Sequence, residues 1–331
     1  MTERGIAAVR QHLAALPPME TMSVPEMRRQ YDRAERVFAV GPEVQVERLE
    51  TPRAERLQPA TAQPGRMVLY LHGGGYVIGS PRSHRHLAAA IASAAAASAL
   101  LLDYRLAPEH PFPAALDDAV AAYRWLLDHG VAPGGIVIAG DSAGGGLTVA
   151  TLVALRDAGL PRPAAGVCIS PWVDLTCSAP SYAAKAATDP IVDGQSVARM
   201  AAAYVGAADR RTPLASPLFA DLAGLPPLLI HVGSEEVLLD DSTALADRAA
   251  KAGVEATLDV WPEMVHVWHW FLPMLDEAQA AIDRIGIFAR ARYVSVEGAR
   301  PRADGPPRAN AAPAKPALER RRISAPGAPD E

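Results

Sequence analysis

The clearest chemical signal in the chain is the sequence G-D-S-A-G over residues 140–144. An apolar run over 136–139 precedes it and a helical pattern follows it, which is the context of a nucleophile elbow between a strand and a helix. Strained backbone at such a turn lets the serine hydroxyl project above the sheet, where a neighbouring base can activate it for attack on a carbonyl carbon. We therefore predict Ser142 as a nucleophile, although a glycine-rich turn can carry the same pattern without any chemistry.

A second glycine-rich sequence, H-G-G-G over 72–75, follows the apolar run 67–71. Attack of a serine on an ester produces a tetrahedral intermediate with a negatively charged oxygen, and fixed N–H donors stabilise that oxygen. We expect an oxyanion hole formed by the N–H groups of Gly74, Gly75 and Ala143. A phosphate-binding loop is the alternative, but no Gly-Lys-Ser/Thr follows the glycines.

The other residues of these two motifs are expected to support the site. We expect His72 to brace its loop rather than to catalyse, and the glycines beside the serine to avoid a clash in the turn. The supporting residues are His72, Gly73, Gly140, Asp141 and Gly144.

A general base has to accompany the nucleophile. With this type of elbow the chain order is serine, acid, histidine, so the candidates are His231, His266 and His269. His231 lies within an apolar run, whereas His266 follows the run 256–260 by a short loop and can reach back over the end of the sheet. We predict His266 as the base and His269 as an ordinary partly buried or capping residue.

The elements that would position these residues alternate along the chain. Strict alternation at 44–47 predicts an antiparallel strand at a sheet edge. Short apolar runs predict buried parallel strands at 67–71, 99–103, 136–139, 166–169, 228–232 and 256–260. Helical patterns occupy 85–97, 114–128, 143–157, 241–252 and 272–290. This order predicts an α/β fold, with a mostly parallel sheet flanked by helices and a site at the carboxyl ends of the strands.

Three segments differ from this pattern. Residues 1–40 are predicted to form N-terminal cap helices. Residues 41–292 are predicted to form the catalytic domain, with a cap insertion at about 178–215. The segment 293–331 is rich in Pro, Ala and Arg and is predicted to be a disordered tail.

Composition excludes several classes of partner. The formal net charge is -5, so no basic surface for nucleic acid is expected. Cys168 and Cys177 are too few for a disulfide framework and no secretory signal is visible, so we expect a cytoplasmic protein. The alanine-rich stretch 87–102 falls short of a membrane span. We expect a small-molecule ester as partner, no nucleic acid, no membrane span, no cofactor and no metal, and we leave a homodimer open.

Taken together, the motifs resemble the bacterial hormone-sensitive-lipase family of esterases. The resemblance covers roughly residues 40–275 and rests on H-G-G-G at 72–75, G-D-S-A-G-G at 140–145, D-Y-R-L-A-P-E-H-P-F-P-A at 103–114, S-P-W-V-D at 170–174 and S-P-L at 216–218. It implies an α/β-hydrolase fold with a small helical cap, hydrolysis of short- to medium-chain carboxylic esters without a cofactor, and the same three oxyanion donors. The stretch 103–114 is expected to be structural, with Asp103 and Arg105 able to pair.

The acid of the predicted Ser-His-Glu triad departs from the family pattern. Where the family usually has D-x-L-x-D, this chain has E-E-V-L-L-D-D over 235–241. Alignment on Leu238 and Asp240 puts Glu236 at the acid position, and Glu235 is the alternative. Asp240 and Asp241 are expected to cap the helix that begins there.

Two other functions remain open beside a carboxylesterase. A lactone hydrolase would use the same acyl-enzyme chemistry on a cyclic ester. A non-catalytic small-molecule binder could use the same scaffold, but the chain carries nucleophile, acid and base in the required order. The sequence therefore favours a carboxylesterase.

Overall fold

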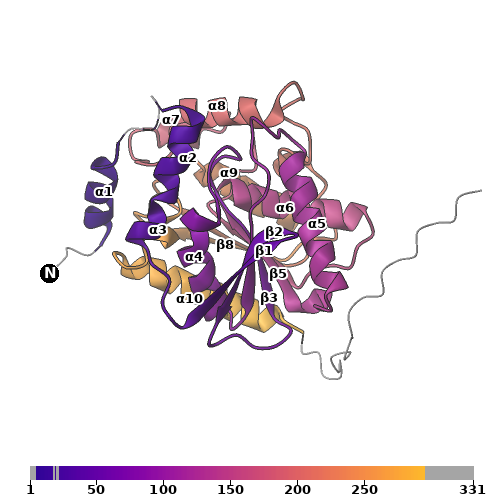
Figure 1. Ribbon diagram of the computed structural model, residues 1–331. Coiled ribbons are helices and arrows are strands. Elements are labelled where there is room, and N and C mark those ends of the chain that lie inside the picture. The colour runs from indigo at the N-terminus through magenta and orange to yellow at the C-terminus, as the bar shows by residue number, and fades with distance from the viewer. Residues whose placement is uncertain (1–4, 18, 20–21, 295–331) are drawn as a thin grey trace, which may run out of the picture. The chain divides into compact units, whose positions relative to one another are not determined.

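Eight strands form one sheet in which the apolar runs of the sequence lie side by side (Figure 1). The computed structural model describes residues 5–17, 19 and 22–294. The strands are β1 (Val44–Glu50), β2 (Arg53–Pro59), β3 (Met67–Leu71), β4 (Ser98–Leu102), β5 (Ile136–Asp141), β6 (Ala165–Ile169), β7 (Leu228–Gly233) and β8 (Ala256–Trp261). Their order is β1-β2-β4-β3-β5-β6-β7-β8, antiparallel from β1 to β4 and parallel across the rest.

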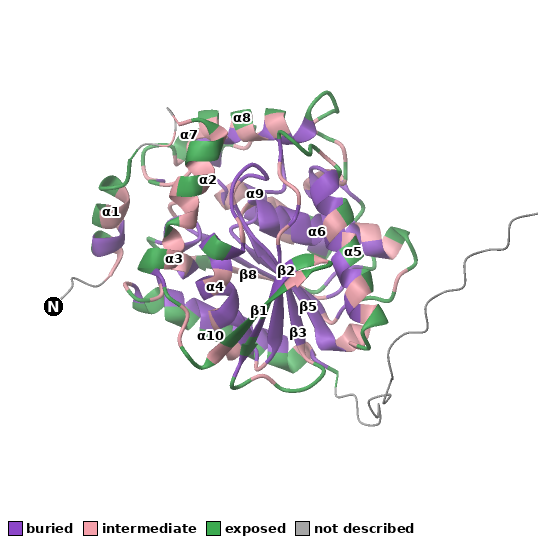
Figure 2. Cartoon of the chain, in the orientation of Figure 1, coloured by how far each residue is buried: buried purple, intermediate pink, exposed green. Residues whose placement is uncertain are grey.

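The burial of the strands follows from their place in the sheet. Every residue of β3, β4, β5, β6 and β7 is buried, because helices cover both faces of these central strands (Figure 2). The antiparallel edge strand predicted at 44–47 is confirmed as β1, which is largely exposed. The run 256–260 is confirmed as a parallel strand, but the prediction that it is buried was wrong, because β8 is the other edge of the sheet and Val260 is 44% exposed.

Helices cover the sheet as the alternation predicts. The principal helices are α4 (Pro81–Ala94), α5 (Ala114–Asp128), α6 (Ala143–Asp157), α9 (Leu239–Lys251) and α10 (Asp276–Arg292), with short 3-10 helices η2 (Pro133–Gly135), η3 (Pro217–Phe219) and η4 (Trp268–Phe271). Side chains of α4 and α10 pack with Val68 and Tyr70 of β3, whereas side chains of α5 and α6 pack with Leu69 and Leu71. Alternate residues of one strand thus face two separate helical layers.

One helix begins earlier than its pattern predicts. The apolar pattern predicts a start at residue 85, but α4 begins at Pro81. The Ser80 hydroxyl accepts a hydrogen bond from the Arg82 N–H, and proline at the first helical position has a favourable φ. Capping, rather than apolar periodicity, therefore sets this boundary.

Five further helices occupy the two segments for which a cap was expected. They are α1 (Ile6–Ala14), α2 (Val24–Asp32), α3 (Ala34–Val37), α7 (Ser181–Ala184) and α8 (Gly194–Val205), and Figure 1 shows α2, α7 and α8 together along the top of the view. Arg28 of α2 donates hydrogen bonds to the carbonyls of Val77 and Ala107 at 2.8 and 2.9 Å. Helix α2 is thereby attached to the loop that follows H-G-G-G and to the loop after β4.

The loop after β4 differs from the sequence-based expectation in one contact. Asp103 pairs with Arg53 of the antiparallel strand β2, at 2.5 Å. Arg105 instead binds Asp118 of α5 at 2.7 Å. The predicted Asp103–Arg105 pair was therefore wrong, because each side chain turns toward a different neighbouring element.

The predicted tail at 293–331 lies outside the described residues from 295 onward. Of its first two residues, Tyr293 is buried and Val294 is 66% exposed. Within the described ranges, no helix has both the length and the apolar character needed to cross a bilayer.

Candidate active site

Ser142 occupies the strained turn between β5 and α6. Its φ of 54° and ψ of -121° lie in a region that residues other than glycine rarely adopt. The Ser142 N–H donates to the Ile169 carbonyl at 2.8 Å, and its carbonyl accepts from the Trp172 N–H at 2.9 Å. The end of β6 and the loop after it therefore hold the strained backbone on both sides.

The loop after β3 passes directly against this turn. A Cβ atom at Gly144 would lie 1.9 Å from the Leu71 carbonyl oxygen, and one at Gly140 would lie 2.3 Å from the Gly144 carbonyl oxygen. Glycine at these two positions is therefore required by close backbone approach. The contact brings the H-G-G-G loop beside Ser142.

The three N–H groups predicted as oxyanion donors lack acceptors. Within the part of the chain that the structure describes, the N–H groups of Gly74, Gly75 and Ala143 donate to no protein atom. Gly74 has a φ of 116°, and a Cβ there would lie 2.3 Å from the Ile78 carbonyl oxygen. Ala143 is the first residue of α6, where N–H groups are free by helix geometry. Such donors can stabilise a negative charge that develops on a substrate oxygen.

The buried carboxylate of Asp141 joins the elbow to the H-G-G-G loop. One of its oxygens accepts from the Gly73 N–H at 3.1 Å and from the Tyr70 hydroxyl at 2.8 Å. Its second oxygen lies 3.3 Å from His84 Nε2. Burial alone would raise the pKa of Asp141, but His84 and Tyr70 together lower it. The carboxylate fixes the start of the glycine loop.

His72 lies buried at the start of the H-G-G-G loop. Its Nδ1 donates to the Gly73 carbonyl at 2.8 Å, and its ring stacks on Tyr104 with centroids 4.1 Å apart. Burial lowers the pKa of His72 to about 3, so the ring is neutral at ordinary pH. The histidine braces its loop from within the core.

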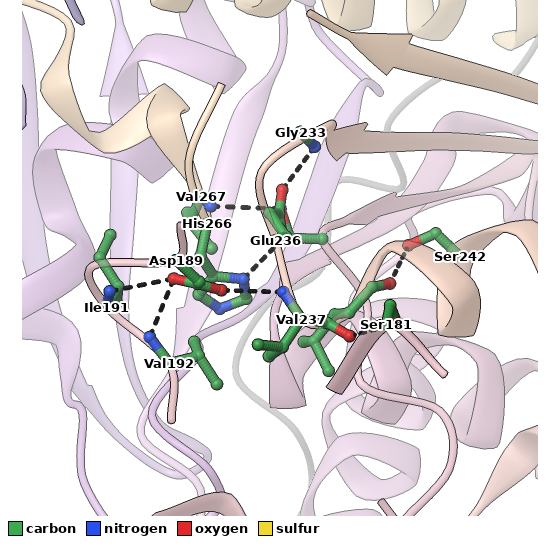
Figure 3. A network of polar contacts seen from close by, with 12 residues as sticks. Ser181, Asp189, Ile191, Val192, Gly233, Glu236, Val237, Ser242, His266 and Val267 are labelled. Atoms are coloured by element: carbon green, nitrogen blue, oxygen red, sulfur yellow. Dashed lines mark hydrogen bonds and ion pairs between the residues drawn. The ribbon is translucent and has the colours of Figure 1, made fainter. Parts of the chain in front are cut away.

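Glu236 and His266 form a buried pair at the carboxyl ends of β7 and β8 (Figure 3). His266 Nδ1 and Glu236 Oε2 are 2.8 Å apart. The other oxygen of Glu236 accepts from the Ser170 hydroxyl at 2.8 Å and from the Gly233 N–H at 2.5 Å. The glutamate is thus fixed by three donors and holds one nitrogen of the imidazole.

The charges of this pair oppose the effect of burial. Burial by itself lowers the pKa of His266, but the hydrogen bond and the charge of Glu236 outweigh burial and raise it above the ordinary 6.5. Burial raises the pKa of Glu236, while His266 and the Gly233 N–H act in the opposite direction. Among the hydrogen bonds of the described chain, the Ser142 hydroxyl makes none with His266; such contacts commonly tighten when substrate binds.

The structure separates Glu236 from the carboxylates near it. Glu235 lies 3.6 Å from Lys185 and accepts from the Ser234 hydroxyl, away from His266. The expectation that Asp240 and Asp241 cap α9 was wrong. Asp240 accepts from the N–H of Ser181, the first residue of α7, and Asp241 accepts from the N–H groups of residues 173 and 174 in the loop after β6, so neither binds an N–H of its own helix.

The two other late histidines form a separate pair. His231 Nδ1 and His269 Nε2 are 3.0 Å apart, and both rings are fully buried. Burial lowers the pKa of His269 well below its ordinary value. His269 is therefore a fully buried core residue rather than the partly buried or capping residue predicted.

Two residues that lie beside the Glu236–His266 pair were not singled out in the sequence. Ser170, with φ 44°, donates to Glu236 and accepts from the Val267 N–H at 3.2 Å. Asp189 accepts from the Val237 N–H at 3.0 Å. Ser170 opens the S-P-W-V-D sequence that contributes to the family resemblance, which was its one available signal. Asp189 carried no recognisable motif.

Comparison with known proteins identifies the family of this chain. Residues 68–270 match the alpha/beta hydrolase fold family, and the chain belongs to this family. An acetyl-hydrolase of Streptomyces hygroscopicus is 55% identical over 262 residues, which are 78% of this chain and 87% of that protein. A crystal structure of an esterase from the bacterial hormone-sensitive lipase family has 50% identity and a TM-score of 0.83, with 86% of this chain and 96% of that chain covered.

A second solved structure is similar to this chain over a comparable length. The esterase EstE5, in crystals soaked with p-nitrophenyl butyrate, has 49% identity and a TM-score of 0.83, with 87% of this chain and 98% of that chain covered. These findings confirm the predicted resemblance to the bacterial hormone-sensitive-lipase family and the α/β-hydrolase fold. The protein is an enzyme of the hydrolase class.

Proposed function

We propose that this protein is a carboxylesterase that cleaves short- to medium-chain acyl esters with Ser142, His266 and Glu236 as a triad. The observation that carries the proposal is the 2.8 Å contact between His266 Nδ1 and Glu236. This pair lies at the carboxyl ends of the parallel strands, as the strained Ser142 turn does. The family and the acetyl-hydrolase and esterase relatives support this class of substrate.

In the proposed acylation step, the Ser142 hydroxyl attacks the ester carbonyl carbon while His266 Nε2 takes its proton. The carbonyl oxygen becomes negative and receives hydrogen bonds from the N–H groups of Gly74, Gly75 and Ala143. Glu236 keeps the imidazole in the tautomer with the proton on Nδ1 and stabilises the imidazolium that forms. Collapse of the intermediate transfers the proton to the departing alcohol and leaves an acyl group on Ser142.

Deacylation repeats these steps with water. His266 removes a proton from the water as it attacks the acyl carbon, and the same donors hold the second oxyanion. Return of the proton to Ser142 releases the carboxylic acid and restores the enzyme.

The proposed cap would enclose the acyl group. Met200 of α8 reaches the oxyanion loop so closely that a Cβ at Gly75 would lie 2.1 Å from its sulfur. A helix placed there limits the space above Ser142, which supports a preference for short acyl chains. We assign residues 1–40 and 178–215 to this cap.

A panel of substrates tests the proposed reaction. We expect kcat/KM for p-nitrophenyl esters to be highest between acetate and hexanoate and to fall for longer chains, because α8 restricts the site. Small lactones should react more slowly than these esters. Faster lactone turnover would assign the protein to the lactone hydrolases, and no turnover of any ester would favour a binding protein.

Substitution of the two adjacent glutamates tests the triad acid. Glu236→Gln is expected to lower kcat by roughly 10³- to 10⁴-fold, because an amide cannot stabilise the imidazolium or favour the correct tautomer. Glu235→Gln is the matched control, and since this side chain is partly exposed and faces Lys185, it should cost less than about tenfold. The kcat of both variants on one acetyl ester decides the assignment, and the reverse ranking would move the acid to Glu235.

A further inference from the structure

Asp189 lies between α7 and α8, far from the triad in sequence, and the residue is 8% exposed. One oxygen accepts from the N–H groups of Ile191 and Val192, each at 3.0 Å. The other oxygen accepts from the Val237 N–H at 3.0 Å. Figure 3 shows this carboxylate beside the ring of His266, with the same three contacts.

The Val237 peptide is the point at which the segment 178–215 holds the triad acid. Val237 directly follows Glu236 and is fully buried. Asp189 binds its N–H group, and the Ser181 hydroxyl donates to its carbonyl at 2.6 Å. Both backbone polar groups of this residue are therefore hydrogen-bonded to the 178–215 segment, directly beside Glu236.

Asp189 also places a second negative charge near the imidazole. The titratable groups that act on His266 are Glu236, in the turn after β7, Asp189, and Asp141, at the end of β5. His269 in η4 also interacts with it. The three carboxylates raise the pKa of His266, against the effect of burial.

We propose that Asp189 is a positioning residue for the triad, which orients Glu236 through the Val237 peptide and stabilises the protonated form of His266 by its charge. This inference rests on the proposed function, because it assumes that His266 is the base. It gives the contacts of Asp189 and Ser181 with Val237 a part in catalysis, beyond the covering role proposed for the rest of the segment.

The test compares Asp189→Asn with Asp193→Asn. Asp193 belongs to the same segment and also accepts from two N–H groups, those of Gln195 and Ser196, but these belong to α8 itself. Asp189→Asn is expected to lower kcat by about tenfold to a hundredfold through misplacement of the acid. It should also move the acidic midpoint of the kcat/KM profile to lower pH, since one negative charge near His266 is lost. Asp193→Asn should change neither quantity.

Two further measurements keep the test decisive. Ser181→Ala loosens the Val237 carbonyl but removes no charge, so it should lower kcat and leave the acidic midpoint unchanged. Titration of His266 by NMR, in wild type and Asp189→Asn that both also carry Ser142→Ala, reports the electrostatic effect without any turnover.

The outcomes separate the two proposals. Equal acidic midpoints and equal His266 titration in Asp189→Asn and wild type would overturn the role of the charge. Unchanged kcat in Ser181→Ala would overturn positioning through Val237, and this variant decides that part if Asp189→Asn does not fold. Absence of ester turnover in the wild type would instead overturn the proposed function and this inference with it.

Discussion

Replacement of Ser142 by alanine is expected to lower kcat by about 10⁵- to 10⁶-fold, which corresponds to roughly 7 to 8 kcal/mol of lost transition-state stabilisation. The reason is that no acyl-enzyme can form, so only binding and the oxyanion donors remain. Alanine has a Cβ atom, as serine does, so the substitution adds no backbone strain at residue 142. The fold should therefore be retained. The measurement is kcat on an acetyl ester, with circular dichroism to verify folding.

A second serine provides the control for this prediction. Ser93, at the end of α4, contacts the Thr61 hydroxyl at 3.3 Å and is expected to have no part in the reaction. Ser93→Ala should change kcat by less than about twofold, as is usual for substitutions outside special sites. Turnover of more than a few per cent in Ser142→Ala would show that another residue is the nucleophile.

The fold could be predicted wherever the apolar pattern was complete. The helices at 114–128 and 143–157 have the predicted bounds, because the first has an amphipathic pattern and the second is a continuous run of apolar and small residues, buried from Ala143 to Val153. Strand β2 was missed because R-A-E-R-L-Q-P contains few apolar residues. Its Glu55 is buried and binds Arg85 of α4 at 2.6 Å, a contact that no local pattern reveals.

The candidate site was predictable to the extent that its chemistry is local. Ser142 and the glycine loop belong to short motifs, and the strand order places His266 and Glu236 at one edge of the sheet. Ser170 and Asp189 act through contacts with residues 66 and 48 positions away. Neither separation follows from periodicity or from strand alternation, so these residues emerged only from the three-dimensional arrangement.

The base assignment predicts opposite behaviour for the two histidines near the end of β8. His266→Ala should lower kcat by about 10⁵- to 10⁶-fold, since loss of the base costs nearly as much as loss of the nucleophile. His269→Ala removes a fully buried ring and leaves the Nδ1 atom of His231 without its partner, which should destabilise the fold by about 1 to 3 kcal/mol. The folded fraction of that variant should retain most of its kcat.

The pH dependence of the wild type gives an independent check on His266. The imidazole accepts a proton only in its neutral form, so kcat/KM should rise as pH increases through the pKa of His266. Because Glu236 and the other carboxylates raise this pKa, the midpoint should lie above 6.5.

Thermal denaturation of the His266→Ala and His269→Ala variants separates loss of stability from loss of chemistry. A larger fall in kcat for His269→Ala than for His266→Ala, in folded protein, would transfer the role of base to His269.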